Sequence, residues 1–321
     1  MKKYFSFILI FILTTLLLKG QMPGEIKWKE NIAKNRIRSQ VQWNHKYKKG
    51  TPVKEGYKNF LKKFDHKGNL IEEVYFQSGS IDQKLSYKYD NNDNKVEFVN
   101  YNNAKNKVMF QQNITYDNNG LKIREERYNG EDYEIIKYTY NSQGKLMKIV
   151  RSDVSGSIKN KRVFNYKGNI CNVNIYSDKT TLTGKIVNKY DSNDNIIETI
   201  EYDTKGKAKE KFVYTFKNNL VQDKAAYVGT KFIYKEIYKY DTKKNLIKIL
   251  KEQPKGKIIV NNIYKYNQKG NLIEEQWYDN NPSENSKKTY YYNDKDVLER
   301  VEVYYALYKY RIQYKYEYTK Y

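Results

Sequence analysis

The sequence predicts an all-β protein, an elongated antiparallel sheet of about eleven β-hairpin repeats of ~25 residues that is rolled or spiralled. Three observations predict it. A Tyr or Phe recurs every 24 to 27 residues, aromatic and polar residues alternate before it, and a turn from Asp or Asn to Gly follows it. The recurring residues are Phe64, Tyr89, Tyr116, Tyr140, Tyr166, Tyr190, Phe216, Tyr240, Tyr266, Tyr292 and Tyr316.

The first strand and the turn of each hairpin are clearest at residues 264–270. Tyr264 and Tyr266 lie two positions apart, so they share one face of a strand while Lys265 lies on the other. Asn267 opens a type I turn, and the last turn position requires a left-handed backbone, which Gly270 adopts at no steric cost. The equivalent turn positions are Gly68, Gly120 and Gly144, with Asp93, Asp194, Asp296 or Lys244 in other repeats.

The second strand of this repeat, Leu272 to Tyr278, opens with two adjacent apolar residues, Leu272 and Ile273. Neighbouring strand residues point to opposite faces, so both faces are expected to be dry near the turn. This favours a sheet that covers its own inner surface.

The domain organisation follows from the ends of the repeats. Residues 57–321 form the predicted repeat array, and residues 21–56 form an N-terminal cap with divergent first strands. Within them, Ile37 to Trp43 is an expected opening strand and Tyr304 to Tyr321 the closing one.

Residues 1–20 have the pattern of a secretory signal peptide. Lys2 and Lys3 precede an apolar run from Tyr4 to Leu18, which is shorter than the roughly 20 residues of a membrane span. We expect cleavage near Gly20, with an uncleaved N-terminal anchor as the alternative. The predicted protein is secreted, at the cell surface or periplasmic, and has no transmembrane span after cleavage.

The formal charge is +23, and three signal-segment lysines leave +20 for residues 21–321. Such a charge attracts anionic partners: acidic glycans, lipid headgroups or nucleic acid. A compositional origin remains open, because abundant Lys, Asn, Ile and Tyr together are typical of an AT-rich genome. Nucleic acid is disfavoured, because an exported protein seldom meets it.

The sequence offers no candidate for catalysis, and we predict no enzyme, cofactor or metal site. His45 and His66 are the only histidines, and Cys171 aligns with apolar residues such as Ile247, which predicts a buried position. Pairs such as Glu72-Glu73 cannot flank one bond, since strand neighbours face opposite sides. The column that begins at Glu72 mixes charge signs and predicts a solvated ladder of cross-strand pairs.

The alternating tyrosines have two interpretations. They pack the core of the repeats, or some rows face outward and stack on sugar rings while lysines contact acidic groups. The candidate ligand-stacking residues are Tyr87, Tyr138, Tyr214, Tyr238, Tyr264 and Tyr290.

The unit Tyr264-Lys-Tyr-Asn-Gln-Lys-Gly-Asn-Leu-Ile273, and its copy from Phe64 to Ile71, resembles the YD repeats of the RHS family. The resemblance covers roughly residues 57 to 321. It implies stacked β-hairpins in a spiralling sheet at or outside the cell surface, and large members form hollow shells around a toxin domain. The chain departs from that pattern, with no Asp-Pro-x-Gly self-cleavage core and no further C-terminal domain in the sequence.

Two functions follow as expectations. The first is a non-catalytic exported scaffold that binds an envelope or extracellular polymer, an anionic polysaccharide in particular. The second is a toxin-associated or protein-interaction element that recruits a protein partner by strand addition.

Overall fold

The computed structural model describes residues 25–102, 107–278 and 284–321, so the predicted signal peptide lies outside it. The described residues contain 23 β-strands, one α-helix and one 3₁₀ turn, and the strand pairs of each unit are antiparallel. The all-β prediction is therefore confirmed. The chain forms two compact units: a central unit, Arg162–Tyr264, and a terminal unit, Ile26–Lys161 with Lys265–Tyr321.

The terminal unit combines elements from both parts of the chain. They are α2 (Glu25–Lys34), β1 (Ile37–Lys48), β2 (Thr51–Pro52), β3 (Tyr57–Phe64), β4 (Leu70–Gln77), β5 (Ser80–Tyr89), β6 (Lys95–Asn102), β7 (Lys107–Tyr116), β8 (Lys122–Tyr128), β9 (Tyr133–Tyr140), β10 (Leu146–Asp153), β20 (Leu272–Trp277), β21 (Ser286–Tyr292), β22 (Leu298–Tyr305) and β23 (Tyr310–Lys320).

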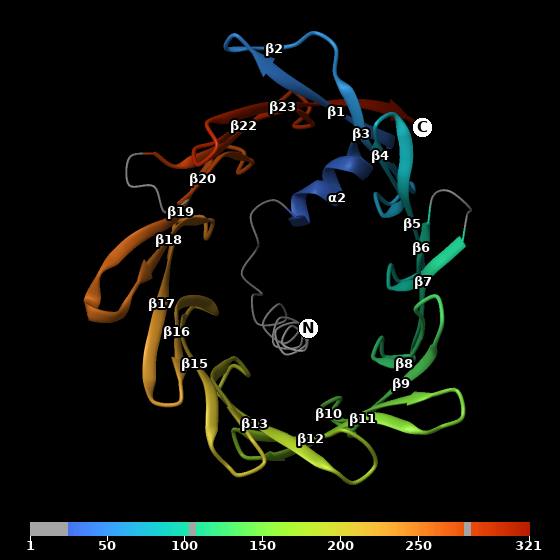
Figure 1. Ribbon diagram of the computed structural model, residues 1–321, viewed down its shortest axis with the longest axis vertical. Helices are drawn as coiled ribbons and strands as arrows, with labels where there is room; N and C mark the ends of the chain where they lie inside the picture. The colour runs from blue at the N-terminus through green and yellow to red at the C-terminus, as the bar shows by residue number, and fades with distance from the viewer. Residues whose placement is uncertain (1–24, 103–106, 279–283) are drawn as a thin grey trace. The chain divides into compact units, whose positions relative to one another are not determined.

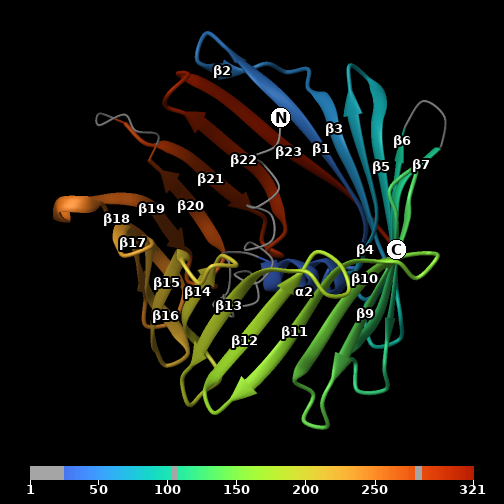
Figure 2. The same cartoon turned by 60° about the horizontal axis from the view of Figure 1, so that its bottom comes forward.

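The central unit is a run of hairpins (Figure 2). Its elements are β12 (Ile170–Tyr176), β13 (Leu182–Tyr190), β14 (Ile196–Tyr202), β15 (Ala208–Lys217), β16 (Leu220–Val228), β17 (Lys231–Tyr240), β18 (Leu246–Glu252) and the 3₁₀ turn η1 (Pro254–Gly256). The unit boundaries fall within β11 (Ile158–Lys167) and β19 (Ile258–Tyr266).

In the terminal unit the first described strand pairs with the last. β1 lies between β3 and β23, with Val41 opposite Leu61 on one side and Glu317 on the other. Figure 1 shows β1 and β23 side by side. The two predicted end strands therefore form a pair with each other, and neither is an edge strand.

The predicted turn chemistry is confirmed. The Asp65 carboxylate accepts backbone hydrogen bonds from Lys67 (2.9 Å) and Asn69 (2.8 Å), while Gly68 N donates to the Asp65 carbonyl (3.0 Å). The last turn position is left-handed with either Gly or its substitutes. The φ angles are 81° at Gly68, 76° at Gly120, 74° at Gly144, 78° at Gly270, 63° at Asp93, 59° at Asp194 and Asp296, and 66° at Lys244.

Periodic tyrosines of the terminal unit donate hydrogen bonds to the repeat that precedes their own. The Tyr292 hydroxyl donates to the Leu272 carbonyl (2.9 Å), where the previous second strand begins. The same bond joins Tyr89 to Leu70 (3.0 Å), Tyr116 to Lys95 (3.1 Å), Tyr140 to Lys122 (2.9 Å) and Tyr318 to Leu298 (2.5 Å). The final member of the column is therefore Tyr318, two residues beyond the predicted Tyr316.

Cys171 is fully buried, as predicted, but the buried column differs from the predicted one by one residue. Val221 lies opposite Phe216, and Leu246 lies opposite Tyr240, so Val221 and Leu246 occupy the same position of their repeats. The predicted column aligns Val221 with Ile247 instead, because the turn after Phe216 is one residue shorter than the turn after Tyr240. The apolar residues buried at this position are Ile196, Val221, Leu246 and Leu272. The prediction that both faces are dry near the turn holds only in part. The first residue of the pair is buried at Ile196, Leu246 and Leu272 but half-buried at Leu70, Leu146 and Leu298, and the second is half-buried at Ile197, Ile247 and Ile273 and exposed at Ile123.

Helix α2 packs on the first hairpin of the array (Figure 1). Trp28 and Ile32 are four residues apart, so they lie on one helical face. Ile32 belongs to a buried cluster with Ile37, Phe64 and Val297, and the Trp28 ring meets Phe64 edge-on at 5.3 Å. This cluster positions the end of the helix over the β21–β22 turn.

Candidate functional site: a basic pocket at the end of helix α2

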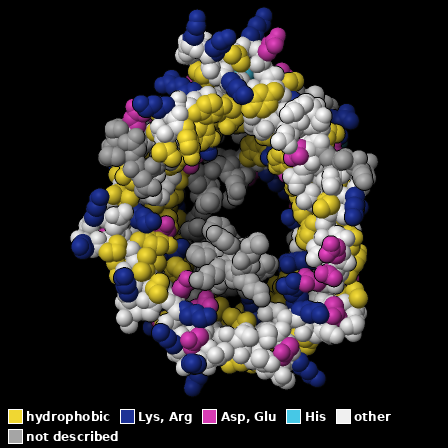
Figure 3. All heavy atoms as spheres, viewed as in Figure 1, with side chains coloured by type: hydrophobic (Ala, Val, Ile, Leu, Met, Phe, Trp, Pro, Cys, Tyr) yellow, Lys and Arg dark blue, Asp and Glu magenta, His cyan; other side chains and the backbone are white. Residues whose placement is uncertain are grey.

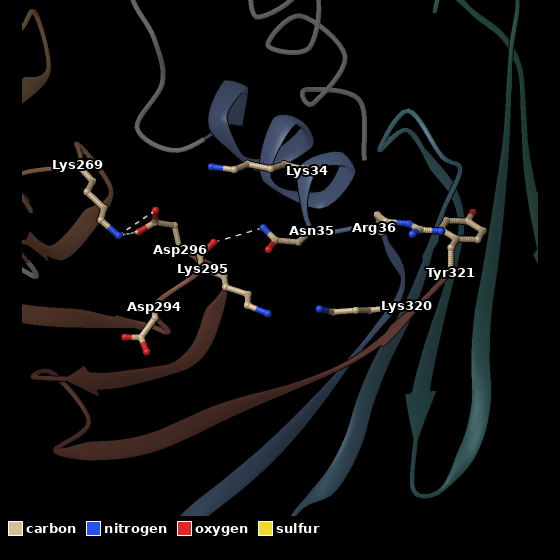
Figure 4. Close-up of a pocket in the computed structure, with 9 residues that line it drawn as sticks. All are labelled: Lys34, Asn35, Arg36, Lys269, Asp294, Lys295, Asp296, Lys320 and Tyr321. Carbon is tan, nitrogen blue, oxygen red and sulfur yellow. Dashed lines mark hydrogen bonds and ion pairs between the residues drawn. The ribbon is translucent and has the colours of Figure 1, made fainter.

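A pocket of about 720 Å³ lies where α2 ends, beside the β21–β22 turn and the end of β23 (Figure 4). It is contained in the terminal unit. Its lining residues are Lys34, Asn35, Arg36, Lys269, Asp294, Lys295, Asp296, Lys320 and Tyr321.

Backbone pairing brings these distant residues together. Ile37 is opposite Lys320 in the β1–β23 register, and Tyr321 N donates to the Arg36 carbonyl (3.0 Å). Two side-chain amides attach α2 to the turn: Asn31 donates to the Asp296 carbonyl (3.2 Å) and Asn35 to the Lys295 carbonyl (3.3 Å). The pocket walls are therefore fixed by hydrogen bonds on both sides.

Positive charge dominates the pocket, because five of its lining side chains are cationic and two are carboxylates. Lys269 pairs with Asp296 (3.0 Å). The remaining four cations, Lys34, Arg36, Lys295 and Lys320, have no carboxylate within 4 Å among the residues that the structure describes.

Figure 4 shows the ammonium ends of Lys295 and Lys320 directed toward one another. Two like charges held face to face repel, and an anion between them would replace that repulsion with two attractions. Both side chains belong to exposed residues, so the site is open to a ligand.

The rest of the charge is more evenly distributed. On the face seen in Figure 3, Lys and Arg side chains are spread over the hairpins with Asp and Glu between them. In the Glu72 column, Glu72 pairs with Lys63 (2.8 Å) and Lys84 (2.9 Å), as the predicted solvated ladder requires. The net charge of the chain alone therefore does not identify the pocket.

The second glutamate column differs from the first and was not predicted. Glu73 and Glu125 are buried, with 6% and 0% of their surface exposed. Glu125 accepts hydrogen bonds from Gln112 (2.6 Å) and Tyr138 (3.0 Å), and it pairs with Lys122 (2.9 Å) and Arg127. Burial acts to raise the pKa of Glu125, but the Lys122 hydrogen bond and the two cations outweigh it and lower the pKa.

The sequence contained a signal that this column is buried, because several of its members are apolar. Its equivalent positions include Ile249 and Val301, and Val301 is 3% exposed. A glutamate among apolar residues indicates a buried, paired carboxylate. The fully satisfied hydrogen bonds of Glu125 fit a stabilising role.

Three of the six candidate stacking tyrosines donate to the buried or half-buried glutamates of that column. Tyr87 donates to Glu73 (2.8 Å), Tyr138 to Glu125, and Tyr290 to Glu275 (3.1 Å). The other three lie in the central unit. Tyr214 and Tyr238 are only 6% and 9% exposed, and Tyr264 packs against the cluster that contains Tyr238.

The two histidines lie in different surroundings. His45 is buried and its Nδ1 lies 3.0 Å from the Val53 carbonyl, while the exposed His66 ring stacks on Tyr321 at 3.8 Å. Within the described ranges, no group of three or more His, Cys, Asp or Glu residues could hold a metal ion. No helix of the described part is long and apolar enough to cross a membrane.

No protein-family model matches the sequence, and no curated protein matches it. Solved structures with similarity include the Tc holotoxin pore of Photorhabdus luminescens, with 15% identity over 79% of this chain and 14% of that one, and a TM-score of 0.38. The TcdB2–TccC3 structure has 14% identity over 84% of this chain and 15% of that one, with a TM-score of 0.40. A porin-like protein of Bacteroides uniformis has 9% identity over 70% of this chain and 97% of that one, with a TM-score of 0.34. The chain spans about one seventh of the length of the two toxin chains.

Proposed function

We propose that this protein is an exported, non-catalytic scaffold of YD-like hairpin repeats, and that its basic pocket binds anionic groups of an envelope or extracellular polymer. The observation that carries the proposal is the pair Lys295 and Lys320. Their ammonium groups face each other without a carboxylate partner among the described residues.

The shape of the pocket supports a polymer better than a small enclosed ligand. Lys34, Arg36, Lys295 and Lys320 all belong to exposed residues, so the cations can be reached from solvent by one charged group of a longer chain. Sulfate, carboxylate and phosphate all suit these donors, because ammonium and guanidinium groups bind each of them.

The test is salt-dependent retention of the purified protein on immobilised polyanions. Heparin, polygalacturonate and polyphosphate represent sulfate, carboxylate and phosphate. We expect Lys295→Glu/Lys320→Glu to elute at clearly lower salt, because two attractive contacts become repulsive.

The matched control is Lys205→Glu/Lys231→Glu, which makes the same charge change at exposed positions of the central unit. If the control and the pocket variant elute together, the polyanion is attracted by net charge alone and the pocket proposal is wrong. If all three resins fail to retain the unaltered protein, polymer binding is refuted, and recruitment of a protein partner becomes the better hypothesis.

A further inference from the structure

The turn between β22 and β23 carries two large apolar side chains at its most projecting positions. Ala306 to Lys309 form the turn, in which Lys309 N donates to the Ala306 carbonyl (3.2 Å). Leu307 and Tyr308 occupy the two central positions and are 58% and 76% exposed. Central turn positions favour small or polar residues. The equivalent central positions of other turns are Thr204-Lys205 and Val154-Ser155, and neither pair holds two large apolar side chains.

More aromatic surface lies beside this turn. Tyr310 and Tyr57 are 40% and 46% exposed, and the Tyr310 ring stacks on Tyr305 with centroids 6.2 Å apart. We call Tyr57, Leu307, Tyr308 and Tyr310 the apolar tip.

Cations surround the apolar tip. Lys46 is opposite Ile312 in the β1–β23 register, so the β1–β2 hairpin lies next to the start of β23, as Figure 2 shows. Lys46 lies 6.0 Å from the Tyr57 ring centroid. The exposed cations near the apolar tip include Lys46, Lys48, Lys49, Lys54, Lys309 and Arg311, and the exposed carboxylates there include Glu55 and Glu284.

We propose that the apolar tip docks on the surface of an anionic lipid bilayer. Leu307 and Tyr308 enter the headgroup region, where aromatic rings with a polar end are favoured, and the surrounding lysines contact lipid phosphates. Long cationic side chains suit this arrangement because their stems lie along apolar surface while their charges reach the headgroups.

The chemistry of the tip favours lipid over sugar. An aliphatic Leu307 at the apex offers no flat ring for a sugar, and the charge around the tip is mostly positive. A bilayer accepts both an aliphatic side chain and the cations, and each lysine near an anionic surface strengthens binding about fivefold.

The tip is also separate from the basic pocket. β23 begins at Tyr310, beside the tip, and ends at Lys320, in the pocket. At about 3.3 Å per residue the strand places the two sites roughly 30 Å apart. The two proposals can therefore be tested independently.

The experiment is co-sedimentation of the purified protein with phosphatidylcholine vesicles that contain or lack phosphatidylglycerol. We expect binding to the anionic vesicles, and a loss of about tenfold or more in Leu307→Glu/Tyr308→Glu, because its apolar contact is removed. Val154→Glu/Val228→Glu is the matched control, since those residues are 70% and 57% exposed in other hairpins. It should bind nearly as well as the unaltered protein.

A second pair of variants tests the charge. Lys48→Gln/Lys49→Gln should weaken vesicle binding about 25-fold, whereas Lys205→Gln/Lys231→Gln should not. The tip variants should keep their retention on heparin, and Lys295→Glu/Lys320→Glu should keep most of its vesicle binding. Vesicle binding that ignores Leu307→Glu/Tyr308→Glu, or its absence from the unaltered protein, would overturn the lipid proposal and leave the pocket proposal standing.

Discussion

Removing one periodic hydroxyl, by Tyr292→Phe, tests how the hairpins of the terminal unit are held together. The Tyr292 hydroxyl donates to the Leu272 carbonyl at 2.9 Å, and the phenylalanine keeps the ring. The packing is unchanged, so the difference measures the hydrogen bond. An intramolecular hydrogen bond of this kind contributes about 1 kcal/mol to the free energy of unfolding.

The same residue gives the substitution a pH signature. Burial raises the pKa of Tyr292 to about 12, against about 10 in an unfolded chain. The phenol is neutral in both states below pH ~10, so its contribution is complete there. Between pH ~10 and ~12 the unfolded state alone loses the proton, and the folded protein loses up to about 2.7 kcal/mol of stability.

Phenylalanine has no proton to lose, so the variant escapes this loss. It should be about 1 kcal/mol less stable than the unaltered protein at neutral pH, and the two stabilities should become equal near pH ~11. Denaturant unfolding followed by circular dichroism at several pH values measures both quantities.

Tyr308→Phe is the control, because that ring is 76% exposed. It should match the unaltered protein at neutral pH. A Tyr292→Phe variant that behaves like Tyr308→Phe, or whose deficit stays constant as the pH rises, would contradict the reasoning.

Three further predictions concern the turns, the buried carboxylate and the tyrosines together. Gly120→Ala places a side chain at φ 76° with no atom within 4 Å of the added carbon, and it should lower the free energy of unfolding by about 1 kcal/mol. At Gly68 (φ 81°) the added carbon would lie 2.5 Å from the Lys29 carbonyl oxygen. Gly68→Ala should therefore lower stability clearly more in the same denaturation assay. Equal costs would show that α2 is not held against that turn. Glu125→Gln should lower stability by about 3 kcal/mol, because it leaves Lys122 and Arg127 without their carboxylate. The pKa of Glu125 is lowered in the folded protein, so the unaltered protein loses this stabilisation as the pH falls below the ordinary glutamate range. The difference between the variant and the unaltered protein should therefore shrink at acid pH. An unchanged deficit at acid pH would assign the loss to packing. On alkaline titration, near-ultraviolet tyrosinate absorbance should rise partly in step with the loss of circular dichroism, because burial raises the pKa of many tyrosines, and a single smooth rise near pH ~10 with the fold intact would contradict this.

The hairpin architecture was predictable because its signals are local. Strand alternation and the turn from Asp65 to Gly68 depend on residues within a few positions of one another, and the backbone confirms both. The buried column was predicted wrongly where the number of residues in a turn changed. One missing turn residue moved Val221 into the column of Leu246, and only the strand register reveals it.

The basic pocket could not be predicted in the same way. It depends on Ile37 lying opposite Lys320, a pairing across most of the chain that no periodicity encodes. The β21–β22 turn containing Lys295 resembles the other turns in sequence, and what distinguishes it is the helix end fixed above it by Asn31 and Asn35. The burial of Glu125 could have been predicted from the sequence, because other members of its column, such as Val301, are apolar.

The pairing of β1 with β23 has a consequence for the order of folding. β1 is synthesised early, and its partners β2 and β3 follow soon, yet its third partner, β23, begins more than 260 residues after β1 ends. Joining segments so far apart costs about 5 kcal/mol of chain entropy, whereas closing a short hairpin loop costs only about 1 kcal/mol. The intervening hairpins can form as they emerge, while one side of β1 keeps unpaired amide groups until synthesis is nearly finished. Folding of this chain therefore depends on whether β23 is completed before another molecule pairs with the open edge of β1.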